Sequence, residues 1–263
     1  MNLRLDGYNA LVCGSSQGIG KAVAIELALL GANITLLARN ASRLQLVLSQ
    51  LPRTETQQHD FLVADFSQPQ TVAKSVQAYL QITQKSFHIL INNTGGPASG
   101  SIVEASPEAF LNAYQAHLVC NQLLAQTVLE GMKKANFGRI INIISTSVKE
   151  PIEGLGVSNT TRAAVAAWAK TWSTEVGRFG ITVNNVLPGF TATQRLEAIV
   201  DIKIKQSGQS EQEVIDTMLS YVPARRFAAP EEVAAAVTFL ASPAAAYING
   251  INLPVDGGRT KSM

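Results

Sequence analysis

A glycine-rich turn follows the first apolar run of the chain, in the sequence Gly14-Ser15-Ser16-Gln17-Gly18-Ile19-Gly20. A pyrophosphate is bound by backbone N–H groups at a helix N-terminus, where no Cβ atom stands in the way. Gly14 permits the tight turn, Gly18 the close approach of the ligand, and Gly20 close packing of the helix on the strand. The spacing predicts a dinucleotide site with Ser15 and Ser16 as added donors; the alternative is a plain strand-to-helix turn.

The residues after the second apolar run bear on the choice of nucleotide. A site for NAD usually offers a carboxylate to the ribose about 20 residues beyond the glycines, whereas a site for NADP offers a cation to the 2′-phosphate. Here the run ends Leu37-Ala38-Arg39-Asn40, without an acidic residue. A guanidinium can bind a phosphate through two parallel hydrogen bonds. Arg39 therefore favours NADP (NADPH) over NAD, although a solvated surface arginine is the alternative.

Helices and strands must hold these residues in place. Along the chain, short apolar runs alternate with longer helical patterns. Such alternation predicts parallel βαβ units whose strands are buried on both faces. We expect an α/β fold with a Rossmann-type doubly wound parallel sheet, a single domain over 1–263, and a small, less regular lid insertion near 191–221. The predicted strands are 9–13, 33–38, 61–64, 88–91, 138–144, 182–186 and 251–255. The predicted helices are 19–30, one that ends near 51, one that ends near 80, 107–135, 157–178 and 230–240.

The spacing Gly-x-x-x-Gly-x-Gly resembles that of the short-chain dehydrogenase/reductase family, and further motifs in the same order extend the resemblance over essentially the whole chain. Asp65 follows the third predicted strand, where the family holds the adenine. The fourth strand is followed by Asn92-Asn93-Thr94-Gly95, similar to the family's Asn-Asn-Ala-Gly. The resemblance implies that the cofactor is also bound by Asn92, Thr94, Gly95, Pro188, Gly189 and Thr191.

The catalytic pattern of the family is present only in part. Its members use a serine after the fifth strand, a Tyr-x-x-x-Lys pair on the long helix, and an asparagine on the preceding helix. Ser145 occupies the serine position. The family spacing then reaches Ser158 instead of tyrosine and Arg162 instead of lysine, and the asparagine position falls on His117.

The substituted residues still allow chemistry. Ser158 and Arg162 share one helix face, and a serine hydroxyl can donate a hydrogen bond to a developing oxyanion although it is a weak acid. Arg162 stays charged, so it can bind the nicotinamide ribose or stabilise an alkoxide. His117 titrates in a range suited to an acid, or it is a half-buried helix histidine. Ser145 would hold the carbonyl oxygen.

Composition excludes several other classes. The chain has 263 residues, 46% hydrophobic and 15% charged, with a net charge of +2 and two cysteines. A mild charge without basic patches argues against nucleic acid, no apolar run is long enough for a membrane span, and the cysteine count favours a reducing cytoplasm. The scattered histidines offer no metal site. The family resemblance also implies a homodimer or homotetramer.

The function implied by the resemblance is an NADP-dependent oxidoreductase that transfers hydride between NADPH and a small-molecule carbonyl substrate. Within the family the chain resembles the 3-oxoacyl-acyl-carrier-protein reductases of fatty acid metabolism most, so an acyl thioester is the expected substrate class. Two alternatives remain open. One is an NADP-binding sensor or partner subunit without reductase activity, and the other is a non-redox enzyme on the same fold.

Overall fold

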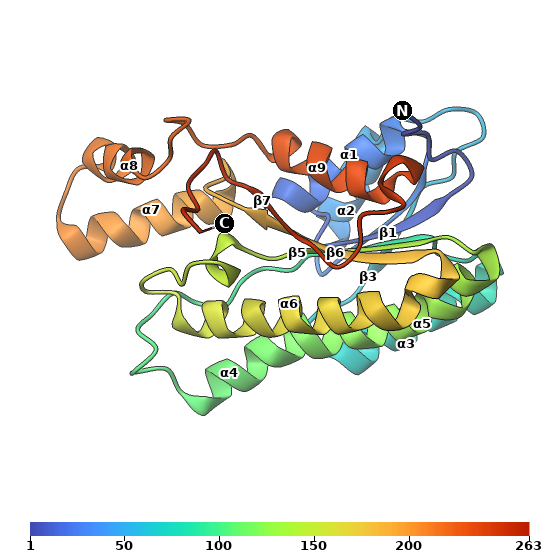
Figure 1. Cartoon of the computed structure of the whole chain (residues 1–263), viewed down its shortest axis with the longest axis horizontal. Coiled ribbons are helices and arrows are strands. Elements are labelled where there is room, and N and C mark those ends of the chain that lie inside the picture. Colours follow the sequence, from blue (N-terminus) through green and yellow to red (C-terminus); the bar gives the residue numbers. More distant parts are fainter. Residues whose placement is uncertain (263) are drawn as a thin grey trace.

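The computed structural model describes residues 1–262, in which a parallel sheet of seven strands forms the centre (Figure 1). The strand order is β3-β2-β1-β4-β5-β6-β7, so the chain reverses its direction of winding between β1 and β4. This is the predicted Rossmann-type doubly wound sheet. The strands are β1 (Asn9–Cys13), β2 (Asn33–Ala38), β3 (Asp60–Val63), β4 (Ile89–Asn92), β5 (Gly138–Ile143), β6 (Ile181–Pro188) and β7 (Asn252–Val255).

Helices cover both faces of this sheet (Figure 1). One layer contains α1 (Gly18–Leu29), α2 (Ala41–Gln50) and α9 (Pro230–Ala241), and the other contains α3 (Pro69–Thr83), α5 (Cys120–Ala135) and α6 (Gly156–Val176). Strand β1 shows why both layers are needed. Its Ala10 and Val12 belong to the core under the first layer, and its Leu11 and Cys13 to the core under the second. Because successive side chains of a strand point to opposite faces, an apolar strand must be covered twice.

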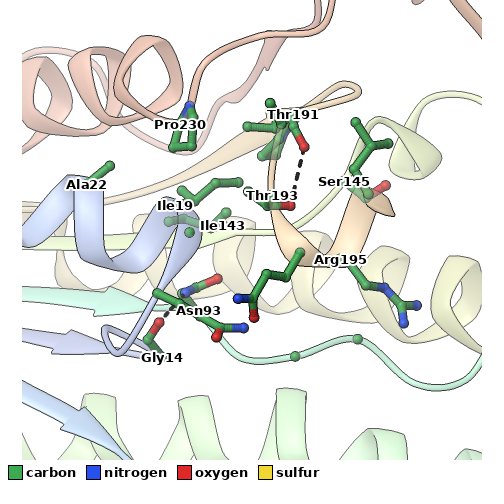
Figure 2. Close-up of a pocket in the computed structure, with 18 of the residues that line it drawn as sticks. Gly14, Ile19, Ala22, Asn93, Ile143, Ser145, Thr191, Thr193, Arg195 and Pro230 are labelled. Atoms are coloured by element: carbon green, nitrogen blue, oxygen red, sulfur yellow. Dashed lines mark hydrogen bonds between the residues drawn. The ribbon is translucent and has the colours of Figure 1, made fainter. Parts of the chain in front are cut away.

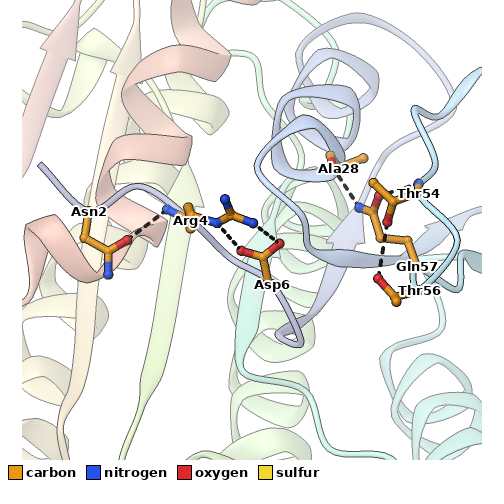
Figure 3. Close-up of polar contacts among 7 residues, drawn as sticks. All are labelled: Asn2, Arg4, Asp6, Ala28, Thr54, Thr56 and Gln57. Carbon is orange, nitrogen blue, oxygen red and sulfur yellow. Dashed lines mark hydrogen bonds and ion pairs between the residues drawn. The ribbon is translucent and has the colours of Figure 1, made fainter.

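Polar contacts fix the edges of the first layer (Figure 3). The buried Gln57 donates from Nε2 to the carbonyl oxygens of Ala28 at 2.8 Å and Ala32 at 2.9 Å. It thereby ties the loop before β3 to the end of α1. Near the N-terminus, Arg4 and Asp6 form an exposed ion pair at 2.6 Å, and such pairs contribute little to stability.

The predicted helix over 107–135 is present but interrupted. It consists of α4 (Pro107–Tyr114), a π-helical turn (Gln115–Val119) and α5. A π-helical turn accommodates one residue more than an α-helical turn and often marks a functional site. His117 lies in this turn, and hydrophobic periodicity alone does not reveal the extra residue.

The insertion near 191–221 is more regular than we expected, and that part of the prediction was wrong. It forms α7 (Gln194–Ser207) and α8 (Glu211–Ser220). Helix α8 begins with a capping box between Ser210 and Glu213, a signal that the sequence contained. The two helices pack against each other through a separate apolar cluster formed by Leu196, Val200, Val214 and Met218.

None of the helices within 1–262 combines the length and the apolar composition required to cross a bilayer.

Candidate active site

A cleft of about 670 Å³ opens at the carboxyl ends of the central strands (Figure 2). Figure 2 shows Gly14 and Asn93 at one end of this cleft and Ser145 at the other. Open α/β sheets bind their ligands at this edge, where the strand order reverses. The structure brings together here most of the residues that the sequence singled out: Gly14, Ser16, Gly18, Ile19, Thr94, Gly95, Ser145, Ser158, Arg162, Pro188, Gly189 and Thr191.

The glycine turn has the geometry that the sequence predicted. Gly14 and Gly18 adopt φ angles of +59° and +54°, which side chains other than glycine rarely tolerate. A Cβ on Gly14 would lie 2.6 Å from the carbonyl oxygen of Asn93. A Cβ on Gly20 would collide with the carbonyl oxygen of Gly14, so Gly20 is needed for packing. No side chain caps the N-terminus of α1, which leaves its first N–H groups facing the cleft and fits a pyrophosphate.

Two of the predicted cofactor side chains are buried away from the cleft. Ser15 is fully buried, and its Oγ accepts a hydrogen bond from the backbone N–H of Leu37 at 3.0 Å. It ties the turn to β2 and is not a ligand donor in the cleft. Asn92 is also buried, and its Nδ2 donates to Oδ1 of Asn142 at 2.8 Å.

Asn92 begins a ladder of amide side chains across the sheet. Asn142 donates to Asn185, and Asn185 donates to Asn252, each at 2.8 Å. These residues are direct partners in the register of β4, β5, β6 and β7. A buried polar side chain needs a partner, and the ladder supplies one to each amide. The ladder links β4, β5, β6 and β7, and Asn92 does not line the cleft.

The residues expected to select the nucleotide lie at the outer edge of the glycine turn, outside the cleft lining. Arg39 and Asp65 are exposed or half-exposed, and Nη1 of Arg39 lies 3.9 Å from Oδ2 of Asp65. A second arginine, Arg43, donates from Nη1 to Oε1 of Gln17 at 2.6 Å. Two cations therefore flank the turn on the side of β2, although the sequence pattern indicated only Arg39.

Arg162 is the most unusual charge of the site. Its side chain is only 8% exposed, and its Nη1 donates to the carbonyl oxygen of Ile143 at 3.0 Å. Its Nε has no hydrogen-bond partner, and none of the ion pairs found in residues 1–262 includes it. Burial, and then the charge of Arg195, lower the pKa of Arg162 to about 10. It is thus a buried cation at neutral pH, and in residues 1–262 no carboxylate pairs with it.

Arg195 was not predicted. It stands in the first turn of α7, and its Nη2 donates to the carbonyl oxygen of Pro97 at 2.9 Å across the cleft. Both Arg195 and Arg162 reach within 4 Å of the position of a Cβ on Gly96. Nothing in the sequence indicated that the two arginines lie close together, because 33 positions separate them.

Asn93 belongs to the Asn-Asn-Thr-Gly motif, but no role was predicted for it. Its Nδ2 donates to the carbonyl oxygens of Cys13 and Gly14.

Ser145 and Ser158 both line the cleft near Arg162. Oγ of Ser145 accepts a hydrogen bond from the backbone N–H of Ser147 at 3.1 Å, which fixes the side chain and leaves its own hydroxyl proton to donate. Ser158 lies in the first turn of α6, one turn before Arg162. Two hydroxyls and one guanidinium are therefore available to an oxygen atom in this part of the cleft, and each can donate a hydrogen bond.

His117 does not line the cleft, so the structure does not place it where the predicted acid would act. The ring is 3% exposed. Burial first, and then the charge of Arg162, lower the pKa of His117 to about 2, although a hydrogen bond to the backbone of Gly95 opposes the shift. The imidazole is therefore neutral near pH 7. It supports the loop at Gly95 from behind.

The buried His117 should make the protein sensitive to acid. Its pKa is about 2 in the folded chain and near 6.5 in the unfolded chain. Below pH 6.5 the unfolded state therefore binds more protons, and stability decreases as the pH is lowered. From pH 6.5 to pH 4 the loss from this group amounts to about 3 kcal/mol. We expect that His117→Asn reduces the acid loss by a large part of that amount. Urea unfolding at both pH values measures it, and parallel curves for the two proteins would contradict the expected difference.

Among residues 1–262 there is no cluster of histidine, cysteine, aspartate and glutamate side chains suited to a metal ion.

The fold, the glycine turn and Ser145 define a dinucleotide-binding oxidoreductase of the α/β class. Comparison with known proteins makes this specific. The family model described as enoyl-(acyl carrier protein) reductase matches residues 14–260. The chain belongs to the short-chain dehydrogenase/reductase family.

Curated relatives and solved structures agree with this assignment. The putative ketoacyl reductase 1 of the granaticin polyketide synthase of Streptomyces violaceoruber is 35% identical and covers 95% of this chain and 92% of its own. The 3-oxoacyl-[acyl-carrier-protein] reductase of Pseudomonas aeruginosa is 33% identical, with 97% and 98% covered. The L-sorbose reductase of Gluconobacter frateurii, solved with NADPH and L-sorbose, superimposes with a TM-score of 0.93 at 30% identity and full coverage of both chains.

Proposed function

We propose that the chain is an NADPH-dependent reductase of a carbonyl compound with an atypical catalytic site. The observation that carries this proposal is the cleft itself. It runs from an uncapped helix N-terminus at Gly18 to a serine hydroxyl and a buried guanidinium at Ser145 and Arg162. One end suits a pyrophosphate and the other a carbonyl oxygen. The relatives that are named as reductases support the same activity.

Different residues of the chain bind the cofactor and the carbonyl group. Bound NADPH would supply the hydride. Gly14 and Gly18 leave room for its pyrophosphate, and Arg39 and Arg43 offer charge to a 2′-phosphate. Ser145 donates a hydrogen bond to the carbonyl oxygen of the substrate. As negative charge develops on that oxygen, the guanidinium of Arg162 stabilises it in a site of low dielectric constant. Ser158 adds a second hydroxyl, and water delivers the final proton.

The finer identity of the substrate and of the assembly is also part of this proposal. A 3-oxoacyl thioester of fatty acid metabolism is one substrate class, supported by the ketoacyl reductases among the relatives. A hydroxylated ketone is the other, supported by the sorbose reductase. The free, buried Cys13 and Cys120 suit a reducing cytoplasm. We expect a homodimer or homotetramer, as the family resemblance implies.

Titration of the purified protein with NADPH and NADH, followed by nicotinamide fluorescence, tests the cofactor. The loss of nicotinamide absorbance with a panel of 3-oxoacyl thioesters, ketoses and simple ketones then tests the reaction. We expect tight NADPH binding and oxidation that depends on the carbonyl compound. Tight binding without oxidation by any member of the panel would favour the sensor or partner-subunit function, for which the departures at Ser158 and Arg162 are the specific observation. Product without net oxidation would indicate a non-redox enzyme.

The cation at the end of β2 should set the cofactor preference. We expect that Arg39→Gln weakens NADPH binding about tenfold or more, because a charge-assisted hydrogen bond to phosphate is lost. NADH, which carries no 2′-phosphate, should bind with unchanged affinity. Arg43→Gln removes the same charge, but because Arg43 is held by Gln17, this change should weaken NADPH binding less than Arg39→Gln does. If Arg39→Gln weakens both cofactors equally, or neither, Arg39 does not read the phosphate.

Introducing the tyrosine and lysine of the family at positions 158 and 162 should not raise the activity. We expect that the double change Ser158→Tyr with Arg162→Lys lowers kcat by about tenfold. Lysine lacks the planar guanidinium that donates to the carbonyl oxygen of Ile143. The larger side chain of tyrosine would reduce the space in the cleft that Ser145 and Ser158 line. Steady-state kinetics of the double variant and of both single variants measure this. A gain in activity would show instead that Ser158 and Arg162 are remnants of a weakened site.

A further inference from the structure

A second cavity, which we call the outer cavity, adjoins the cleft. Its volume is about 680 Å³, and its lining shares Ser145, Leu155 and Phe190 with the cleft. A compound in the outer cavity can therefore present one atom to Ser145 while most of it lies outside the cofactor cleft. The walls are largely apolar, with Ile199 and Ile202 from α7 and Val214 and Met218 from α8.

One guanidinium from the far end of the chain lies on this apolar surface. Arg259 lines the outer cavity, and its Nη1 donates to Oγ1 of Thr146 at 3.1 Å. Its Cζ lies 4.5 Å from the centre of the Phe190 ring. A hydrogen bond and a cation–π contact together hold a planar group in one orientation. Thr146 directly follows Ser145, and both Ser145 and Arg259 line the outer cavity.

The carboxylates near Arg259 are occupied by the backbone. Asp256 accepts from the N–H groups of Gly258 at 3.0 Å and Thr260 at 2.8 Å. Glu150 accepts from the N–H groups of Lys261 and Ser262, both at 2.7 Å. These bonds shape the C-terminal segment, and within residues 1–262 no ion pair forms with Arg259.

The charge of Arg259 is therefore only partly compensated. Burial lowers the pKa of Arg259, although Asp256 and Glu150 oppose the shift from a distance. A half-buried guanidinium that is held rigidly and has donors to spare suits a planar anion, because a carboxylate can accept two parallel hydrogen bonds from it. The other cation of this cavity, Lys203, is exposed on α7, where a flexible and hydrated ammonium group is less suited to that geometry.

We propose that Arg259 determines specificity by binding a carboxylate, so that the compound reduced at Ser145 is an oxo acid with an apolar body. This inference rests on the proposed reductase function for the position of the carbonyl, but the carboxylate site stands on the geometry of the outer cavity alone. Because Thr146 is adjacent to Ser145 in the sequence, we expect the carbonyl and the carboxylate of this compound to be close together, as in 2-oxo and 4-oxo acids.

Kinetics with matched substrates test the proposal. The pairs are 2-oxooctanoate and 4-oxooctanoate, each against its methyl ester. For the wild type we expect kcat/KM to favour the acid of at least one pair by about tenfold or more, mainly through KM. In Arg259→Gln that ratio should fall to near one, and in Arg259→Lys a smaller preference should remain, because the charge is kept. Lys205→Gln removes a charge from α7 outside both cavities and should leave the ratio as it is. A ratio that is near one in the wild type, or unaffected by Arg259→Gln, would overturn the assignment.

Binding of unreactive ligands separates this proposal from the reductase function. Octanoate, octan-1-ol and octyl phosphate are titrated calorimetrically into the NADPH-saturated protein, or into the free protein if NADPH does not bind. We expect octanoate to bind about tenfold or more tightly than octan-1-ol, and Arg259→Gln to remove that difference. This result is independent of any turnover. Equal binding of octanoate and octan-1-ol would refute the carboxylate site, and preferential binding of octyl phosphate would replace the carboxylate by a phosphate.

Discussion

The variant Arg162→Met is expected to lower kcat/KM about 100-fold or more, the size of effect seen when a preorganised donor to an oxyanion is removed. In the structure Arg162 is 8% exposed and lies at the end of the cleft that Ser145 lines. At this depth its charge acts on a developing alkoxide with little screening by water. Steady-state kinetics with NADPH and the best carbonyl substrate measure the loss.

The same variant should become more stable, and this separates a catalytic role from a structural one. In residues 1–262 no carboxylate pairs with Arg162, and Arg195 repels it. Burying an unpaired ion costs several kcal/mol, whereas the lost bond to Ile143 costs about 1 kcal/mol. We therefore expect Tm to rise by about 2–4 °C. Thermal unfolding without cofactor at pH 7 measures it.

The destabilisation caused by the buried charge of Arg162 has a defined dependence on pH. Because the pKa of Arg162 is about 10 in the folded chain and higher in the unfolded chain, the penalty is fully present below pH 10. It diminishes only as the guanidinium loses its proton above that pH. The gain in Tm should thus be constant from pH 6 to pH 9. A variant that loses activity and stability together would show that Arg162 holds the fold instead of the oxyanion.

Sequence reasoning succeeded where local pattern and chemistry coincide. The glycine turn is an example, since Gly14 and Gly18 need φ angles of +59° and +54°, which few residues other than glycine adopt. Ser145 lines the cleft because it lies two residues beyond β5, a strand whose end must lie at the ligand-binding edge. The strand boundaries agree to within two residues, since buried parallel strands form unbroken apolar runs. The helix boundaries agree less well: α3 extends to Thr83, three residues beyond its predicted end.

It failed where the environment of a side chain decides. The sequence shows a histidine at position 117 but not its pKa, which is near neutrality for an exposed histidine and about 2 for His117. Only its depth and its nearness to Arg162 distinguish the two cases. Asn92 and Asn93 are adjacent and identical, yet one joins the amide ladder and the other faces the cleft. The alternation of a strand assigns them to opposite faces, but a motif match does not say which face holds the ligand.

Removal of the Ser145 hydroxyl is expected to lower kcat about 100-fold or more, with a smaller change in KM. Ser145→Ala deletes the donor to the carbonyl oxygen, and that bond strengthens as the oxygen gains charge. The energetic effect therefore falls on the transition state more than on the bound substrate. The titration with NADPH should be unchanged, because the hydroxyl lies at the opposite end of the cleft from Gly14.

Ser147→Ala, two residues further along the chain, is the matched control for Ser145→Ala. The Oγ of Ser147 is buried and has no hydrogen-bond partner, while its backbone N–H, which the variant keeps, is the group that orients Ser145. Deleting an unsatisfied buried hydroxyl should leave kcat within about twofold and leave stability equal or slightly higher. If the two alanine variants lost activity equally, the short segment after β5 would act as a structural unit, and the role assigned to the Ser145 hydroxyl would have to be abandoned.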